Sequence, residues 1–372
     1  MVIREEPGIY EGANPLEEKI KRLILDRGAM PFCRFMEMAL YDPQGGYYET
    51  RADIIGASGD FITSPEVGPV FGRLIATHLT GLWTEAGCPS SMQVREYGAG
   101  QGRLCREALG FLQARRPDCY HALNYLLIER STAMRLQLRQ LMEQESFSER
   151  CNIVEADDFL ARPDVPQVLI ANELLDAFPV HWAVNRNGRL LEKWVDWDGG
   201  GFVAVEKEPC TDRLGSYRRW LGAPLEEGQE VIINLAAVEW MEKVSAMKSP
   251  LHLVIIDYGF LAEELQRRPD RSNSLACYHG QTVNFEPLRN AGCQDMTAHV
   301  DFSALMKRGS ELGFSVKRFD TQLNFLLDLV SSSLNWFDWE ADIELRLNLK
   351  ELVHPERMGE CFRVLELGRG RQ

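Results

Sequence analysis

The sequence has no long apolar run. No stretch approaches the roughly 20 consecutive apolar residues that a membrane-spanning helix requires. The amino terminus, Met1 to Pro7, has neither an apolar signal core nor the Arg-rich, Ser-rich character of a transit peptide. No internal repeat is visible, so a repeat architecture is not expected. These absences predict a soluble, bacterial-type cytoplasmic protein without a membrane span.

The sequence also lacks a metal-binding cysteine pattern and an excess of positive charge. The nine cysteines are scattered singly, with no Cys-x-x-Cys pair and no histidine at ligand spacing. We therefore predict reduced, buried thiols and no metal site. Lys and Arg number 41 against 55 Asp and Glu, for a formal charge of −14. That charge would repel a phosphate backbone, so no nucleic-acid partner is expected, whereas a basic protein or peptide would be attracted.

The chain is longer than one compact core usually holds. Its 372 residues are 45% hydrophobic and 26% charged, an ordinary globular composition. We predict a helical amino-terminal region over 1–90 with a cofactor-covering loop, and a core over 91–181 and 251–372. A hairpin and helical unit over 182–250 and a helical segment over 321–358 are predicted as insertions. Hairpin signals stand at Asn187-Gly188 and Asp198-Gly199.

Apolar runs alternate with helical patterns along the core, which is typical of a doubly wound parallel sheet. Seven strands are predicted, near residues 92–97, 124–129, 151–155, 167–172, 251–258, 314–318 and 361–367. The first five should be parallel, and the last two should form an antiparallel edge. The prediction is an α/β fold with a Rossmann-like seven-stranded sheet, a helical amino-terminal region, and insertions after strands four and six.

The most informative motif is a glycine turn between the first predicted strand and a helix. Gly98, Gly100 and Gly102 alternate where side chains would keep a ligand away from the backbone. Position 103 is Arg, so the dinucleotide pattern Gly-x-Gly-x-x-Gly is not met and pyrophosphate binding is disfavoured. The acid Glu96 suits instead a cationic ligand such as the amino end of S-adenosylmethionine (SAM).

Further acids and loops complete the predicted cofactor site. Glu129 ends the next apolar run, where an acid can accept both ribose hydroxyls. The glycine turn alone can arise in an ordinary loop, and an acid such as Glu129 alone can arise at any strand end, but together they indicate SAM. The other predicted cofactor-binding residues are Asp157 and Asp158 near the adenine, Asn172 after strand four, and Gly59 and Asp60 in a covering loop.

A helix start is also predicted next to that covering loop. Thr63-Ser64-Pro65 places a hydroxyl cap before a proline at a first helical position. Simple capping is the alternative reading of this segment. Further along the chain, Cys277 to Gly280 lies in a polar stretch that reads as a loop without an assigned role.

Catalytic residues are expected after strand four, beyond the carboxyl ends of the parallel strands. Glu173 and Asp176 are three residues apart and would share one face of a helix. Two carboxylates can bind a guanidinium, and one can help remove a proton. His299 could orient the acceptor or accept a proton. The alternatives are that the two acids cap a short helix and that the histidine is structural.

Five motifs, in order along most of the chain, resemble the MidA family of DUF185-type methyltransferases. They are Tyr-Asp-Pro…Gly-Tyr-Tyr at 41–48, Gly-Asp-Phe-x-Thr-Ser-Pro-Glu-Val at 59–67, Glu-x-Gly-x-Gly-x-Gly at 96–102, Asn-Glu-x-x-Asp-Ala-x-Pro-Val-His at 172–181, and Gln-Asp-x-Thr-Ala-His-Val-Asp-Phe at 294–302. This family includes a mitochondrial complex I assembly methyltransferase.

The resemblance implies a class I SAM-dependent methyltransferase fold. It also implies arginine methylation of a protein, namely a respiratory complex I subunit or homologue. Two alternatives stay open: a non-catalytic SAM-binding assembly protein, and a small-molecule methyltransferase. The sequence leaves open whether the chain forms a homodimer.

Overall fold

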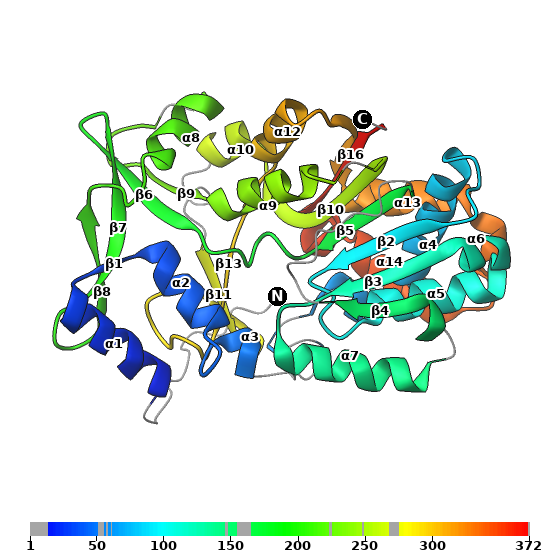
Figure 1. Cartoon of the computed structure of the whole chain (residues 1–372), viewed down its shortest axis with the longest axis horizontal. Coiled ribbons are helices and arrows are strands. Elements are labelled where there is room, and N and C mark those ends of the chain that lie inside the picture. Colours follow the sequence, from blue (N-terminus) through cyan, green and yellow to red (C-terminus); the bar gives the residue numbers. More distant parts are fainter. Residues whose placement is uncertain are drawn as a thin grey trace.

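The computed structural model describes residues 14–50, 56, 59–60, 62–145, 148–154, 165–222, 225–247, 249–267 and 275–370 (Figure 1). Within these ranges no helix combines the length and apolar character needed to cross a membrane. A large sheet occupies one side of the view, and a smaller sheet with α1 and α2 occupies the other. A third sheet lies between them.

The large sheet confirms the predicted fold class. Its strands run in the order β15-β16-β10-β5-β2-β3-β4, with the short β14 beside β10. The five strands β4, β3, β2, β5 and β10 are parallel, and β16 is antiparallel to both β10 and β15. Their bounds are β2 (Met92–Tyr97), β3 (Leu123–Ile128), β4 (Cys151–Val154), β5 (Gln167–Asn172), β10 (Leu251–Phe260), β14 (Val300–Asp301), β15 (Ser315–Thr321) and β16 (Phe362–Arg369).

Helices cover both faces of this sheet because its central strands are apolar on both sides. On β10, Val254 and Ile256 pack into one cluster, whereas Leu253 and Ile255 pack into the other. Full burial of each such side chain contributes roughly 1.5–3 kcal/mol. The first cluster includes side chains of α4 (Pro69–Glu85), α5 (Arg103–Arg115), α6 (Pro117–Ala122), α7 (Thr132–Gln144), α13 (Gln322–Ser332) and α14 (Ile343–Val353); the second includes those of α9 (Leu235–Ser245) and α12 (Phe302–Glu311).

The helix predicted after the covering loop begins later than expected. Ser64–Glu66 forms a short 3-10 helix, and the Thr63 side chain makes no capping hydrogen bond. The long helix α4 starts at Pro69, with Gly68 as its N-cap. Pro65 therefore lies in the short 3-10 helix, whereas Pro69, four residues later, takes the first position of the long helix.

The second sheet forms mainly from the segment after β5. Its strands are β1 (Met30–Pro31), β6 (His181–Arg186), β7 (Arg189–Trp197), β8 (Phe202–Lys207) and β9 (Glu230–Ile233), with α8 (Arg213–Leu221) between the last two. Both predicted hairpins are confirmed by the antiparallel pairs β6–β7 and β7–β8. Asn187 and Gly188 have φ values of 51° and 74°, as a tight hairpin turn requires.

The third sheet corrects a sequence prediction. Cys277 to His279, which read as a loop, belongs to β11 (Leu275–His279) and pairs with β12 (Thr282–Asn284) and β13 (Asp295–Ala298). The polar composition of this segment suggested a loop, but it arises because one side of the small sheet lines a cavity instead of a core. The remaining elements are α1 (Pro15–Arg27), α2 (Phe32–Tyr41), α3 (Tyr47–Thr50), α10 (Ala262–Arg267), the 3-10 helices at Ser148–Arg150 and Leu334–Trp336, and a π-helical turn at Pro355–Gly359.

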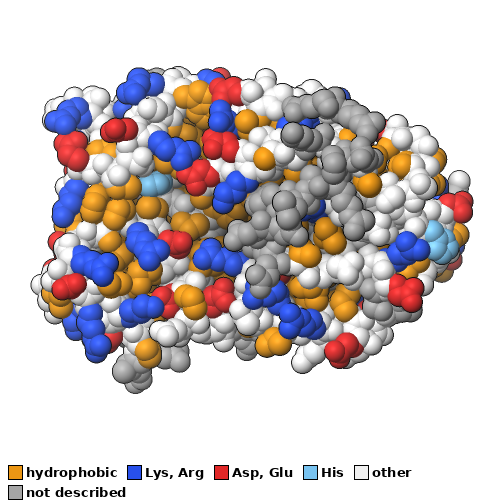
Figure 2. Space-filling view, viewed as in Figure 1, with side chains coloured by type: hydrophobic (Ala, Val, Ile, Leu, Met, Phe, Trp, Pro, Cys, Tyr) orange, Lys and Arg blue, Asp and Glu red, His pale blue; other side chains and the backbone are white. Residues whose placement is uncertain are grey.

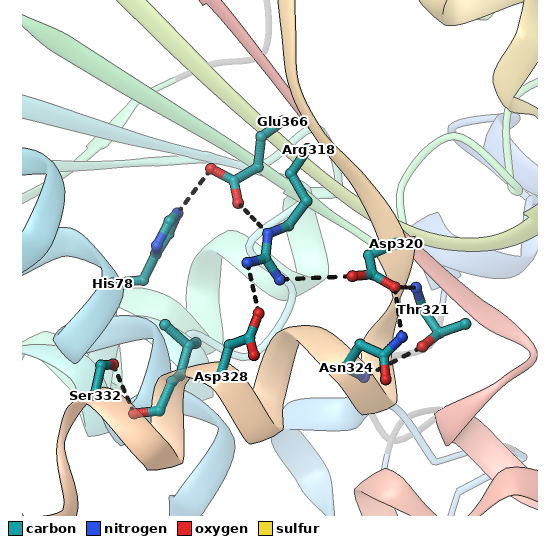
Figure 3. Close-up of polar contacts among 9 residues, drawn as sticks. His78, Arg318, Asp320, Thr321, Asn324, Asp328, Ser332 and Glu366 are labelled. Carbon is teal, nitrogen blue, oxygen red and sulfur yellow. Dashed lines mark hydrogen bonds and ion pairs between the residues drawn. The ribbon is translucent and has the colours of Figure 1, made fainter.

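A polar network ties the antiparallel edge of the large sheet to its helices. Glu366 of β16 forms ion pairs with His78 of α4 at 3.2 Å and with Arg318 of β15 at 3.6 Å (Figure 3). His252 of β10 also reaches Glu366, at 2.7 Å. Burial alone would raise the pKa of Glu366, but hydrogen bonds from His252 and His78 hold that pKa well below its ordinary value.

Lys and Arg side chains are interspersed with Asp and Glu on the face shown in Figure 2. They form no continuous basic stripe on the described part of that face.

Candidate active site

A cavity of about 1220 Å³ opens at the carboxyl ends of the parallel strands. Residues from the glycine turn after β2, the segment after β5, the end of β10 and the third sheet line it. The amino-terminal region adds Tyr41 and Tyr48. We call this space the central cavity. It lies where doubly wound sheets bind their ligands.

The glycine turn lies between β2 and α5, as predicted. Gly98 and Gly100 line the central cavity and have left-handed φ values of 67° and 53°. The N–H of Gly98 donates to the Ile128 carbonyl at 2.8 Å, which joins the turn to the end of β3. These conformations strain any residue with a β-carbon.

The third predicted cofactor glycine, Gly102, packs against a helix. It is not among the residues that line the central cavity. A β-carbon there would come within 2.6 Å of Leu138 and 3.0 Å of Leu141, both on α7. Gly102 therefore permits close packing of the turn against α7, and its contact with the cofactor stays a prediction.

The two acids of the predicted cofactor site both line the central cavity. Glu96 accepts a hydrogen bond from the Tyr125 hydroxyl at 2.6 Å. Burial raises the pKa of Glu96 to about 8, partly offset by Tyr125 and reinforced by the charge of Glu129. One Glu129 oxygen accepts from the Gly100 N–H at 2.9 Å and the other from the Ser131 N–H at 2.8 Å. Glu129 thus fixes the glycine turn in place while it faces the cavity.

The segment after β5 carries the predicted catalytic acids but is not helical. It is a turn in which Glu173 has a left-handed φ of 50°. Asp257, within β10, holds this turn, because its carboxylate accepts from the Leu175 N–H at 2.9 Å and the Asp176 N–H at 3.3 Å. Helical spacing was therefore the wrong reason for pairing Glu173 with Asp176, although both acids do line the central cavity.

These acids are held in an environment that favours their protonated forms. Burial raises the pKa of Glu173 to about 8, although its oxygen accepts from the Ser64 N–H at 2.8 Å. Burial raises the pKa of Asp176 to about 6, with the Tyr258 hydroxyl acting in the opposite direction. Asn172 also lines the cavity and donates to Glu173 at 3.2 Å. A carboxylate tuned toward neutral pH is suited to proton transfer.

The other predicted residues are distributed around the same space. His299 lines the central cavity, with its ring 5.6 Å from Tyr258 and 5.2 Å from Phe260 between centroids. Asp60 lines it too and accepts from the Tyr47 hydroxyl and the Gly280 N–H, each at 2.7 Å. Gly59 precedes it but is not among the lining residues. Asp157 and Asp158 lie outside the described residues.

Sequence reasoning missed an acid and an aromatic wall. Asp295 of β13 lines the cavity and accepts from the Tyr48 hydroxyl at 2.7 Å. Burial raises the pKa of Asp295 to about 7. Tyr41 and Tyr278 line the same wall. The signal was present, because Asp295 lies in the motif at 294–302 and two of the tyrosines lie in the motif at 41–48.

The central cavity is strongly acidic. Among the described residues that line it, the two arginines, Arg103 and Arg357, already pair with Glu66 and Glu351. The eight described carboxyl groups belong to Asp60, Glu66, Glu96, Glu129, Glu173, Asp176, Asp295 and Glu356. A cavity with this excess of acids favours cationic ligands.

Comparison with known proteins assigns the family. Residues 74–319 match the family model described as "Putative S-adenosyl-L-methionine-dependent methyltransferase". The chain belongs to this methyltransferase family. This match covers the glycine turn, the acids after β5 and the end of β10. The sequence-based assignment to a SAM-dependent methyltransferase family is therefore confirmed.

Relatives of this methyltransferase cover almost its whole length. "Protein arginine methyltransferase NDUFAF7, mitochondrial" is 36% identical in Xenopus tropicalis, over 95% of this chain and 86% of the relative. The human protein of that name is 34% identical, over 95% of this chain and 84% of the relative. A Burkholderia thailandensis protein solved with bound S-adenosyl-homocysteine superimposes with a TM-score of 0.83 at 28% identity, covering 96% of this chain and 92% of that one.

The described residues of the methyltransferase fit SAM. The open glycine turn allows backbone approach at Gly98 and Gly100, and Glu96 offers a counter-charge for a cationic ligand. Glu129 stands at the end of the adjacent strand, where carboxylate oxygens can accept from ribose hydroxyls. When bound, SAM supplies a methyl group activated by a sulfonium.

Replacing Glu129 with Ala is expected to weaken SAM binding by about 1.5–3 kcal/mol, because charge-assisted hydrogen bonds are lost. Glu129→Gln keeps an acceptor oxygen and should lose less. Isothermal titration calorimetry measures both affinities. A change within error for both variants would remove Glu129 from the cofactor site.

SAM binding at pH 7 is expected to release a proton. The raised pKa of Glu96, about 8, leaves its carboxyl group mostly protonated at that pH, and a cationic ligand favours the ionised form. The same raised pKa makes the ligand-free protein less stable as pH rises from the ordinary glutamate range to about 8, since the unfolded chain loses this proton earlier.

Calorimetry in two buffers of different ionisation enthalpy measures the released protons. We expect roughly half to one proton per SAM molecule, falling in Glu96→Gln. Equal apparent enthalpies in the two buffers would show that Glu96 does not change its protonation.

Proposed function

We propose that this methyltransferase modifies an arginine side chain of a protein, with a respiratory complex I subunit or homologue as the first candidate. The observation that carries the proposal is the acidic, tyrosine-lined central cavity, which Glu173 and Asp176 line together with the glycine turn. A guanidinium is a planar cation with five donors that suit paired carboxylates. The names of the NDUFAF7 relatives and the resemblance to the MidA family support the same acceptor.

In this proposal the residues mainly align the acceptor. Glu173 and Asp176 accept guanidinium N–H groups and turn one nitrogen toward the methyl group. The positive charge of the bound guanidinium would favour the ionised form of Glu173. As the nitrogen–carbon bond forms and the carbon–sulfur bond of the donor breaks, the nitrogen would lose a proton to the Glu173 carboxylate, and the sulfur would be left as a neutral thioether. His299, packed against Tyr258 and Phe260, limits the orientation of the acceptor. Alignment supplies most of the rate because the donor is already activated.

The test uses isotope-labelled SAM. The purified protein is incubated with labelled SAM and a lysate of its own source, and labelled residues are mapped by mass spectrometry. We expect label on arginine of one protein. Label confined to a small molecule, or on a different residue type, would contradict the proposal.

A further inference from the structure

Four potential metal ligands from four separate segments meet between α2 and the second sheet. Cys33 lies in the first turn of α2, His181 begins β6, Glu192 lies on β7, and Cys210 follows β8. One donor atom from each residue lies within 4.8 Å of all the others. None of the four residues lines the central cavity. The cluster is therefore separate from the active site.

Two donor separations in this cluster are close to those of a tetrahedral centre. Zinc bonds of about 2.3 Å to sulfur and 2.0–2.1 Å to nitrogen or oxygen imply separations of roughly 3.3–3.8 Å between neighbouring donor atoms. Cys210 Sγ lies 3.8 Å from His181 Nδ1 and 3.6 Å from Glu192 Oε1. His181 Nδ1 and Glu192 Oε1 are closer, at 2.7 Å, because they share a hydrogen bond. A metal ion would replace that shared proton.

The surroundings orient Glu192 toward this centre. Its side chain is fully buried, with 0% exposed. The Cys210 N–H donates to Oε2 at 2.6 Å, which leaves Oε1 directed at the sulfur and the imidazole. Among the described residues its ion-pair partner is His181 instead of a Lys or Arg. Burying a carboxylate is costly without a cation, and a divalent ion would supply that charge.

A second histidine and glutamate cluster differs from this one in its charges. His78, His252 and Glu366 also bring three donors together. There the guanidinium of Arg318 lies against the carboxylate, 3.6 Å away, and already supplies a positive charge (Figure 3). The cluster of His78, His252 and Glu366 also contains no thiol. The Cys33 cluster has two thiols and no such arginine among its described contacts.

We propose that Cys33, His181, Glu192 and Cys210 bind one Zn²⁺ ion. Two thiolates, an imidazole and a carboxylate form a donor set that zinc prefers over magnesium or calcium. The ion joins α2 to β6, β7 and the loop after β8. The far end of α2 carries Tyr41, whose hydroxyl donates to the Ala177 carbonyl at 2.8 Å. Zinc binding thus stabilises the wall of the active site from a distance.

Metal analysis of the intact chain, purified under reducing conditions, tests this. We expect about one zinc ion per chain, and a loss of at least about tenfold in Cys210→Ser and Cys33→Ser. Cys88→Ser, which removes another exposed cysteine outside the cluster, should keep its zinc. Adding Co²⁺ to the metal-free protein should give the visible absorption of a tetrahedral cobalt–thiolate site, and Zn²⁺ should abolish it.

A chelator provides a second readout, the stability of the unmodified protein itself. It should lower the melting temperature of the unmodified protein but not that of Cys210→Ser. Absence of zinc together with absence of the cobalt spectrum would overturn the proposal. So would a thiol titration in which two metal-free thiols are missing until reductant is added, because that result would indicate a Cys33–Cys210 disulfide instead.

Discussion

We expect Glu173→Gln to lower the rate of methyl transfer by roughly 10²–10⁴-fold, the usual contribution of a positioned proton acceptor. The substitution keeps an oxygen that can accept from the Ser64 N–H, so the turn after β5 should persist. It removes the charge and the proton acceptor. SAM affinity should change by less than about threefold, because the lost interaction involves the methyl acceptor.

Initial rates of label transfer into the acceptor protein measure this effect, and calorimetry measures SAM affinity. Glu340→Gln is the matched control, since Glu340 is exposed and does not line the central cavity. The double variant Glu173→Gln with Asp176→Asn should lose little more than Glu173→Gln if the two acids act together. Full activity in Glu173→Gln would exclude this residue from the chemistry.

The second large effect is expected at the glycine turn. Gly100→Val should weaken SAM binding by roughly 2.5–5 kcal/mol, or about 70- to 5,000-fold. One part of this loss of affinity is the strain of a left-handed φ of 53° on a residue with a β-carbon. The other is the hydrogen bond from the Gly100 N–H to Glu129, which the altered turn would lose. Calorimetry or equilibrium dialysis with SAM measures the result.

Gly188→Val provides the control for backbone strain. Gly188 also has a left-handed φ, 74°, but it lies in the β6–β7 hairpin with nothing within 4 Å of an added β-carbon. This variant should be somewhat less stable and should bind SAM normally. Unchanged SAM affinity in a folded Gly100→Val protein would rule out the proposed position of the cofactor.

Local patterns predicted the large sheet and the glycine turn correctly. Apolar runs such as Val168 to Ile170 identify buried strands, and Asn187-Gly188 identifies a hairpin, because neighbouring residues alone determine these features. The same approach failed for Glu173. Its helical spacing from Asp176 suggested a helix, but hydrogen bonds from the turn to Asp257, more than 80 residues later, impose another conformation.

The sequence by itself determined the fold class, the cofactor and most acids of the site, because these depend on short-range periodicity and on residues that end strands. Only the tertiary structure decided that Gly102 packs on α7, that Asp295 faces Tyr48, and that Cys33 meets Cys210. Those contacts join residues far apart in the chain. The packing of separate elements creates them, and spacing along the sequence carries no record of that packing.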